Sequence, residues 1–144
     1  MVRGAVSCEH TMEDCIFCRI VSKQLPANIL YEDESYIALM DVFPRVKGHT
    51  LVIPKIHYRW TYDVPQFGEY WEVAKKIALV IQADLEATYT SFLTVGEEVP
   101  HAHIHILPQS GDRLGGVAFK PIIEMTPGEI SKLADRIKAT LSQT

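Results

Sequence analysis

Residues 101–107 read HAHIHIL, a stretch in which histidine alternates strictly with apolar residues. Successive side chains of a β-strand point to opposite faces of the sheet, so the stretch predicts a strand with His101, His103 and His105 on one face. Burial explains the opposite, apolar face. It does not explain the histidine face, because a row of imidazoles on a sheet surface buries little apolar area. We therefore expect this strand to carry the chemistry of the protein.

Two kinds of chemistry suit the histidine row. Histidines two residues apart on a strand can bind one metal ion. Imidazole also suits nucleophilic and acid–base catalysis, because its unperturbed pKa of about 6.5 leaves most of it neutral at neutral pH. The residues of this stretch leave both possibilities open.

The segments around this strand predict an α+β domain. Apolar residues recur at three- and four-residue steps over 67–85, which predicts a long helix over about 65–88. A capping box at 126–129, with proline at the first helical position, predicts a last helix over about 127–141. The remaining predicted elements are short, namely a helix over 15–22 and strands over 28–31, 36–40, 49–53 and 91–95. Because tight turns join the early strands and strands do not alternate regularly with helices, we expect an antiparallel sheet of about five strands.

Composition narrows the class of protein. The 144 residues, 47% hydrophobic and 22% charged, suit one domain with a sizeable core. A net charge of −4 argues against general binding to nucleic-acid polymers. No apolar run approaches the roughly 20 residues of a membrane-spanning helix, and the first residues lack the apolar stretch of a secretory signal. We therefore expect a cytoplasmic protein without a membrane partner.

The three cysteines are Cys8, Cys15 and Cys18, and the last two form a Cys-x-x-Cys pair. Without an export signal, a structural disulfide is not expected. The pair alone is compatible with metal binding, with redox chemistry or with two buried thiols. One possible local metal site combines the three cysteines with His10.

These motifs resemble those of the histidine triad (HIT) superfamily of nucleotidyl hydrolases and transferases. The family motif His-φ-His-φ-His-φ-φ, where φ is apolar, is matched in full by residues 101–107. GHTLVIPK at 48–55, Asp41 ahead of it and CIFCRI at 15–20 are further matches, in the family's order.

The resemblance implies a HIT-like fold and a single HIT domain over residues 1–144. Its core would span about 14–108 and would be followed by the C-terminal helix over about 127–141. Family members are generally homodimers, joined through the long helix and a sheet edge, so we expect a homodimer here.

The resemblance also implies a mechanism. In the family, the middle histidine attacks the α-phosphate of a nucleotide conjugate and forms a transient nucleotidyl-histidine, which assigns this role to His103. A carbonyl of the backbone holds its other ring nitrogen. His105 would hydrogen-bond the phosphate or the leaving group, and His49 would brace the site from the neighbouring strand. The implied substrates are AMP or GMP conjugates, namely phosphoramidates, aminoacyl-adenylates or dinucleoside polyphosphates, and no organic cofactor is expected.

Asp41 stands where the family places a carboxylate that accepts hydrogen bonds from both ribose hydroxyls, although a turn or cap residue is another reading. The positions that line the family's nucleobase pocket are matched by Ile16, Phe17, Ile20, Leu39 and Val42. Each of these apolar residues fits a plain core position equally well.

The zinc-binding branch of the superfamily adds a metal site. There, two histidines complete the Cys-x-x-Cys pair, one after the strand that ends here at Pro54 and one at the start of the triad. The resemblance therefore implies a structural zinc held by Cys15, Cys18, His57 and His101. His103 and His105 would stay available for phosphate chemistry.

The chain departs from the family pattern at the phosphate. Thr90 replaces an asparagine, and Glu97 and Glu98 replace neutral polar residues in a Gly-Gln-Ser-like element. A carboxylate near a phosphate is repulsive unless it points away or meets a cation. The stretch 42–62 holds four basic residues and no acidic one. These charges either attract an anionic substrate or form an ordinary solvated surface.

The alternative functions are a metal-dependent hydrolase that uses the histidine row as ligands and a nucleotide-binding module with little turnover.

Overall fold

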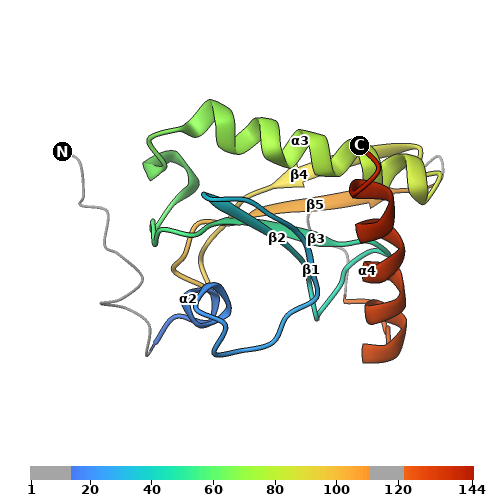
Figure 1. The fold of residues 1–144 in the computed structure, drawn as a ribbon, viewed down its shortest axis with the longest axis horizontal. Helices are drawn as coiled ribbons and strands as arrows, with labels where there is room; N and C mark the ends of the chain where they lie inside the picture. The colour runs from blue at the N-terminus through green and yellow to red at the C-terminus, as the bar shows by residue number, and fades with distance from the viewer. Residues whose placement is uncertain (1–13, 111–121) are drawn as a thin grey trace.

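The computed structural model describes residues 14–110 and 122–144, which form an antiparallel sheet covered by helices (Figure 1). The five strands are β1 (Ile29–Glu32), β2 (Tyr36–Met40), β3 (Thr50–Pro54), β4 (Tyr89–Leu93) and β5 (Ile104–Gln109). They lie in the order β1-β2-β3-β5-β4, and every neighbouring pair is antiparallel. The predicted α+β class and the antiparallel sheet are confirmed.

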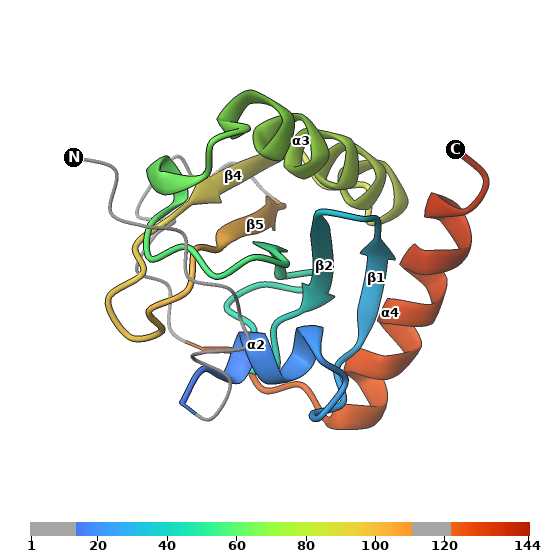
Figure 2. The same ribbon diagram turned by 60° about the vertical axis from the view of Figure 1, so that its left-hand side comes forward.

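Helices lie on both faces of this sheet. α3 (Phe67–Asp84) and α4 (Pro127–Leu141) pack on one face, and the short helix α2 (Ile16–Val21) packs on the other (Figure 1, Figure 2). A 3-10 helix, η1 (Thr61–Asp63), leads into α3. Within the part of the chain that the structure describes, no helix is both long enough and apolar enough to span a bilayer.

The predicted helices form for the expected reasons. The stripe along α3 is buried through Tyr70, Ala74, Ile77, Ala78 and Ile81. α4 has the predicted bounds, and its capping box is present, because Thr126 Oγ1 accepts from the Glu129 amide and the Glu129 carboxylate accepts from the Thr126 amide. α3 ends at Asp84 rather than near residue 88, and Glu86 takes a left-handed φ of +52° just beyond it.

β5 begins at Ile104, so the prediction of a strand from His101 is wrong at its start. Val52 pairs with Ile104, and continuing that register would place Pro54 opposite Ala102. Proline has no N–H to donate, so the ladder cannot extend there. Instead, the Ala102 amide donates to the carbonyl of Tyr58 at 2.7 Å, which keeps the histidine segment extended beside residues 54–58. β4 likewise covers 89–93 rather than 91–95.

The predicted alternation along the histidine segment places its residues in different surroundings. Ala102, Ile104 and Ile106 are buried in the core beneath α3 and α4. The ring of Phe17 from α2 contacts His101 and His103 instead. The histidines therefore lie on the α2 side of the sheet, together with the two cysteines of the Cys-x-x-Cys pair.

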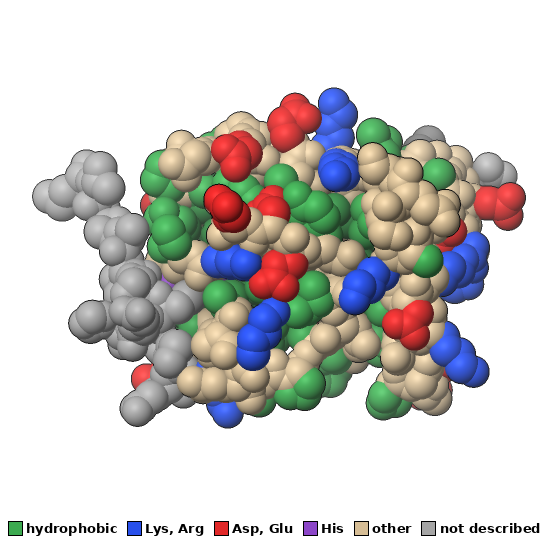
Figure 3. Space-filling view, viewed as in Figure 1, with side chains coloured by type: hydrophobic (Ala, Val, Ile, Leu, Met, Phe, Trp, Pro, Cys, Tyr) green, Lys and Arg blue, Asp and Glu red, His purple; other side chains and the backbone are tan. Residues whose placement is uncertain are grey.

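Basic and acidic side chains are mixed on the face of the molecule seen in Figure 3, where neither sign gathers into a continuous patch. Elsewhere in the described residues, the Glu32 carboxylate pairs with both Lys23 and Lys55 at 3.0 Å. The face seen in Figure 3 gives no broad attraction to a polyanion.

Gly48 leads into His49 with a φ of +85°, and a Cβ there would lie 2.5 Å from Leu85 Cδ1 and 3.1 Å from Pro108 Cγ. We expect Gly48→Ala to lower the free energy of unfolding by about 2 kcal/mol or more, through strain and overpacking. The matched control is Gly68→Ala, because no atom lies within 4 Å of its added methyl group and helix propensity favours alanine. Urea unfolding measures both, and equal stability of the two variants would contradict this account.

Candidate functional site

Two cysteines from the start of α2 and two histidines from distant segments form a compact cluster. The ligand atoms of Cys15, Cys18, His57 and His101 all lie within 4.8 Å of one another. Sulfur and nitrogen atoms of the cluster lie close together. The Nδ1 atom of His101 is 3.4 Å from Cys15 Sγ and 3.5 Å from Cys18 Sγ, and the Nδ1 atom of His57 is 3.3 Å from Cys18 Sγ. A tetrahedral zinc ion holds sulfur and nitrogen ligands about 3.6 Å apart, given its usual bond lengths. The spacing of the cluster therefore fits this ion.

Hydrogen bonding prepares His101 for a metal. Its Nε2 lies 2.8 Å from the carbonyl of Pro54, which can only accept, so Nε2 carries the proton. The lone pair on Nδ1 then faces the two sulfurs. A backbone acceptor on the outer nitrogen is the usual partner of a metal-bound histidine. Phe17 closes the cluster with its ring edge, 5.7 Å from the His101 ring centroid.

Burial controls protonation in this cluster. It raises the pKa of the Cys15 thiol to about 11 and lowers the pKa of His101 to about 4. The bare groups are therefore a neutral thiol and a neutral imidazole at neutral pH. A divalent cation would stabilise the thiolate form and would find the imidazole already deprotonated. The donor set and its charge state both fit zinc.

The structure brings together all four residues that the resemblance assigns to zinc. The alternative local site needs Cys8 and His10, and both lie outside the described residues. Neither Cys15 nor Cys18 forms a disulfide.

The second group of histidines lies directly beside this cluster. His103 Nδ1 is 2.7 Å from the carbonyl of His101, so Nδ1 donates and Nε2 keeps its lone pair. The ring is 7% exposed and packs edge-on against Phe17 and His105, with centroid distances of 5.3 Å and 4.9 Å. His103 therefore presents a neutral ring with a defined unprotonated nitrogen.

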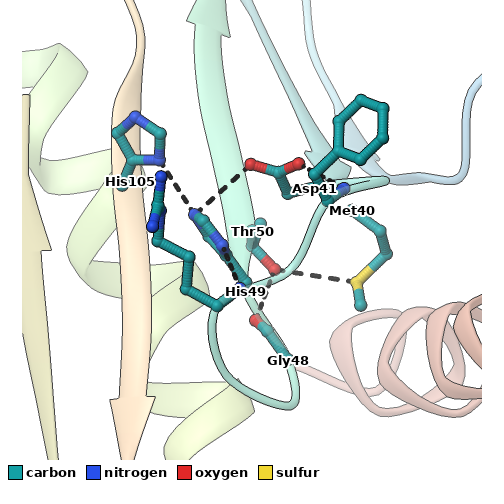
Figure 4. Close-up of polar contacts among 8 residues, drawn as sticks. Met40, Asp41, Gly48, His49, Thr50 and His105 are labelled. Carbon is teal, nitrogen blue, oxygen red and sulfur yellow. Dashed lines mark hydrogen bonds and ion pairs between the residues drawn. The ribbon is translucent and has the colours of Figure 1, made fainter. Parts of the chain in front are cut away.

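His49 and His105 form a hydrogen-bond chain with a fixed direction (Figure 4). The Arg45 amide donates to His49 Nδ1 at 3.1 Å, which places the His49 proton on Nε2. His49 Nε2 then donates to His105 Nδ1 at 2.8 Å. His105 consequently carries its own proton on Nε2, and this tautomer follows from the hydrogen-bond network.

The ligand atoms of Asp41, His49 and His105 are close enough together to bind a cation. The hydrogen-bond chain through His49 and His105 argues against a cation there. Two imidazole nitrogens on one tetrahedral zinc lie about 3.3 Å apart, whereas these two share a proton at 2.8 Å. Coordination through His49 Nε2 would also put a proton on its Nδ1, opposite the Arg45 amide. The group fits a hydrogen-bond relay.

Asp41 serves two neighbours at once. Its Oδ1 accepts from the Phe43 amide at 2.8 Å, as a turn residue does, and its Oδ2 lies 3.5 Å from His49 Nε2 (Figure 4). The turn reading therefore holds for one oxygen, while the other faces the histidines.

The residues predicted for the nucleobase pocket fall into two groups. Phe17, Ile20 and Leu39 are buried in the core beneath α2. Ile16 and Val42 are 49% and 60% exposed, so core packing does not account for them. Exposed apolar side chains beside a polar cluster are suited to contact a ligand.

The protonation of the three central histidines is set mainly by burial. Burial lowers the pKa of His49 and of His103, and Arg59 lowers that of His103 further while Asp41 opposes the shift. The pKa of His105 falls to about 3 through burial and the neighbouring charges of His103, His49 and Arg45. All three imidazoles are neutral at neutral pH.

Several contacts of the site were not foreseen from the sequence. Thr94 Oγ1 donates to the carbonyl of His103 at 2.9 Å, and Arg59 donates to the carbonyl of Gly96. Thr90, at the position of the relatives' asparagine, bonds Gln82 of α3 at 2.8 Å. Single hydrogen bonds to backbone carbonyls leave no spacing pattern in a sequence, so no signal marked them.

Comparison with known proteins identifies the family. The HIT domain model matches residues 22–112. Protein hit of Bacillus subtilis is 32% identical, over 94% of this chain and 99% of its own length. Adenosine 5′-monophosphoramidase HNT1 of Saccharomyces cerevisiae is 30% identical, over 88% of this chain and 82% of its own.

Among solved structures, a zinc-bound histidine triad family protein from Mycobacterium smegmatis aligns with a TM-score of 0.75 and 29% identity, over 91% of this chain and 95% of its own. The family model covers more than half of the present chain, and the Bacillus subtilis relative covers nearly all of it. The chain therefore belongs to the histidine triad (HIT) family.

Proposed function

We propose that the protein hydrolyses nucleotide conjugates, or transfers their nucleotidyl group, at the α-phosphate through a covalent intermediate on His103. The observation that carries this proposal is the 2.7 Å hydrogen bond that leaves His103 Nε2 unprotonated. Adenosine phosphoramidate is the first substrate to test, because a relative with 30% identity is named an adenosine 5′-monophosphoramidase. Aminoacyl-adenylates and dinucleoside polyphosphates present the same reacting group.

The reaction proceeds in two displacements at phosphorus. His103 Nε2 forms a bond to the α-phosphorus, and the bond to the leaving group breaks, with the electron pair passing to that group, which takes a proton from solvent. The His103 ring gains positive charge during the attack, and the carbonyl of His101 stabilises it through Nδ1–H. Water then attacks phosphorus and loses a proton to solvent, while the bond between Nε2 and phosphorus breaks and its electron pair returns to Nε2. This step releases the nucleotide and restores neutral His103.

The surrounding groups bind the substrate. His105 donates its Nε2–H to the phosphate or the leaving group, and His49 fixes that tautomer from β3. Asp41 Oδ2 accepts hydrogen bonds from the ribose hydroxyls. Ile16 and Val42 contact the base, and the buried side chains of Phe17, Ile20 and Leu39 support them.

The cluster of Cys15, Cys18, His57 and His101 binds a structural zinc ion. Its geometry and the zinc-bound family member both support this assignment. The bound ion supplies folding free energy, on the order of 10 kcal/mol for structural zinc sites. It joins α2 to the histidine segment and takes no part in the displacement.

A homodimer through α3 and the edge of the sheet fits the surface there. β4 is an edge strand, and its Phe92 and Phe67 at the start of α3 are 40% and 46% exposed. Trp71 lies between them, with ring centroids 6.1 Å and 5.8 Å away. An apolar face next to an unpaired strand edge is suited to a second copy of the chain.

His103→Ala should abolish turnover of adenosine phosphoramidate, by at least about 10³-fold, because the nucleophile is lost. Lys138→Ala, which removes an exposed side chain on α4, should leave the rate unchanged. AMP binding, measured by calorimetry, should persist in the His103 variant. A wild type that binds AMP without turnover would favour the binding module, and activity lost on chelation in folded protein would favour the metal-dependent hydrolase.

Cys18→Ser should reduce bound zinc from about one ion per chain to a small fraction and should lower the melting temperature, because one of the four ligands is lost. Elemental analysis and thermal unfolding measure the two effects. Ser22→Ala, which removes an exposed hydroxyl just after α2, is the matched control. Full zinc content in the Cys18 variant would contradict the site.

The histidine pKa values predict loss of stability in acid. The pKa of His105 is about 3 in the folded protein, against about 6.5 in the unfolded chain, so only the unfolded chain takes up this proton in between. The stabilisation is therefore complete above about pH 6.5 and is lost as the pH falls toward 3. His105→Asn should reduce the proton uptake on unfolding by nearly one at about pH 5. Equal pH dependence of denaturant unfolding in both proteins would refute this assignment.

A further inference from the structure

A loop with two glutamates, residues 94–100, leads directly into the histidine segment, and it is fastened to the stretch after His57. Building on the function proposed above, we infer that Arg59 is a positioning residue for the phosphate end of the site. Its guanidinium holds the carbonyl of Gly96, which fixes the path of this glutamate loop into His101 and His103. Its charge compensates the two carboxylates on the loop.

The Arg59 side chain is itself held in place. Its Nη1 donates to the carbonyl of Gly96, and its guanidinium carbon lies 3.8 Å from the centroid of the Trp60 ring. The Trp60 ring also stacks on Tyr62, with ring centroids 5.9 Å apart. A planar guanidinium that stacks on an indole loses little further freedom when it forms a hydrogen bond, and lysine cannot reproduce this geometry.

Gly96 has the backbone conformation and the space that the clamp formed by Arg59 and Trp60 requires. It has a φ of +70°, and a Cβ there would lie 3.3 Å from two Trp60 ring carbons and 3.5 Å from Arg59 Nη1. Any other residue would be strained and would press on both partners. Arg59, Trp60 and Gly96 therefore form one packed unit.

Both ends of this unit are connected to the catalytic segment. Tyr58, next to Arg59, accepts from the Ala102 amide at 2.7 Å. Thr94, at the start of the glutamate loop, donates to the carbonyl of His103 at 2.9 Å. A displaced loop would therefore shift the backbone carbonyl of His101, which orients the nucleophile. Small displacements of reacting groups lower the reaction rate strongly.

The charge of Arg59 addresses the repulsion expected from the sequence. Glu97 and Glu98 are exposed, and they follow directly after the carbonyl that Arg59 binds. A cation bonded to the loop reduces the negative potential that a substrate phosphate meets there. Arg59 therefore has two separable effects. Its planar guanidinium, stacked on Trp60, sets the position of the glutamate loop, and its charge sets the affinity for the substrate phosphate.

The test compares Arg59→Ala, Arg59→Lys, Gly96→Ala and the double variant Arg59→Ala/Gly96→Ala, with Lys138→Ala on α4 as the control for lost charge. In the ligand-free protein, hydrogen–deuterium exchange over residues 94–103 should speed up in every Arg59 and Gly96 variant and stay unchanged in the control. Unchanged exchange would overturn the clamp, whatever the activity.

With adenosine phosphoramidate, Arg59→Ala should lower kcat about tenfold and raise KM several-fold. Arg59→Lys should restore KM but not kcat, because it keeps only the charge. Gly96→Ala should lower kcat alone, and the double variant should be no slower than about the worse single variant. Three outcomes would contradict the inference. They are a fully additive loss of kcat in the double variant, recovery of kcat in Arg59→Lys, and loss of bound zinc together with the loss of kcat. Failure of the wild type to turn over the substrate or to bind AMP would instead remove the proposed function and the substrate part of this inference.

Discussion

The account depends on the hydrogen bond between His103 Nδ1 and the backbone carbonyl of His101. It selects the tautomer of His103 and, in the proposed reaction, would stabilise the charge that the ring gains. His101 makes this bond with its main chain while its ring serves the cysteine cluster through Nδ1 and the Pro54 carbonyl through Nε2. One residue therefore links the proposed zinc site to the orientation of the proposed nucleophile.

In the proposed function, three histidines with the same spacing take three different roles because their surroundings differ. The ladder between β3 and β5 stops before the segment 101–103, which leaves the backbone there available to orient a side chain. His105 lies within β5, opposite Leu51, and receives its tautomer from the neighbouring strand through His49. Directed hydrogen bonds thus give three equally spaced histidines different partners, which suit the proposed roles of metal ligand, nucleophile and donor.

Much of the fold was predictable because local signals agreed with one another. The periodicity over 67–85 and the capping box at 126–129 depend on neighbouring residues, and α3 and α4 formed where these signals lie. The start of β5 was not predictable from alternation alone, because it depends on which residue of β3 lies opposite. The strand pairing that places Pro54 there is a long-range property.

The candidate site divides in the same way. The cluster of Cys15, Cys18, His57 and His101 was predicted only through the resemblance to the zinc-binding branch, because the Cys-x-x-Cys pair alone also fits redox chemistry or buried thiols, and the fold brings the four residues together. Asp41, Ile16 and Val42 could not be separated from turn or core residues until their exposure and contacts were known. Arg59 was indistinguishable from a solvated cation, because its partner is a backbone carbonyl 37 residues away.

The most direct test is to trap the intermediate. Wild-type protein mixed with excess adenosine phosphoramidate should be quenched within the first turnover, digested without acid and mapped by mass spectrometry. The account predicts one adenylyl group on the peptide that carries His103, attached to the ring nitrogen not bonded to His101. An adenylyl group on another residue, or rapid turnover with no covalent adduct, would contradict it.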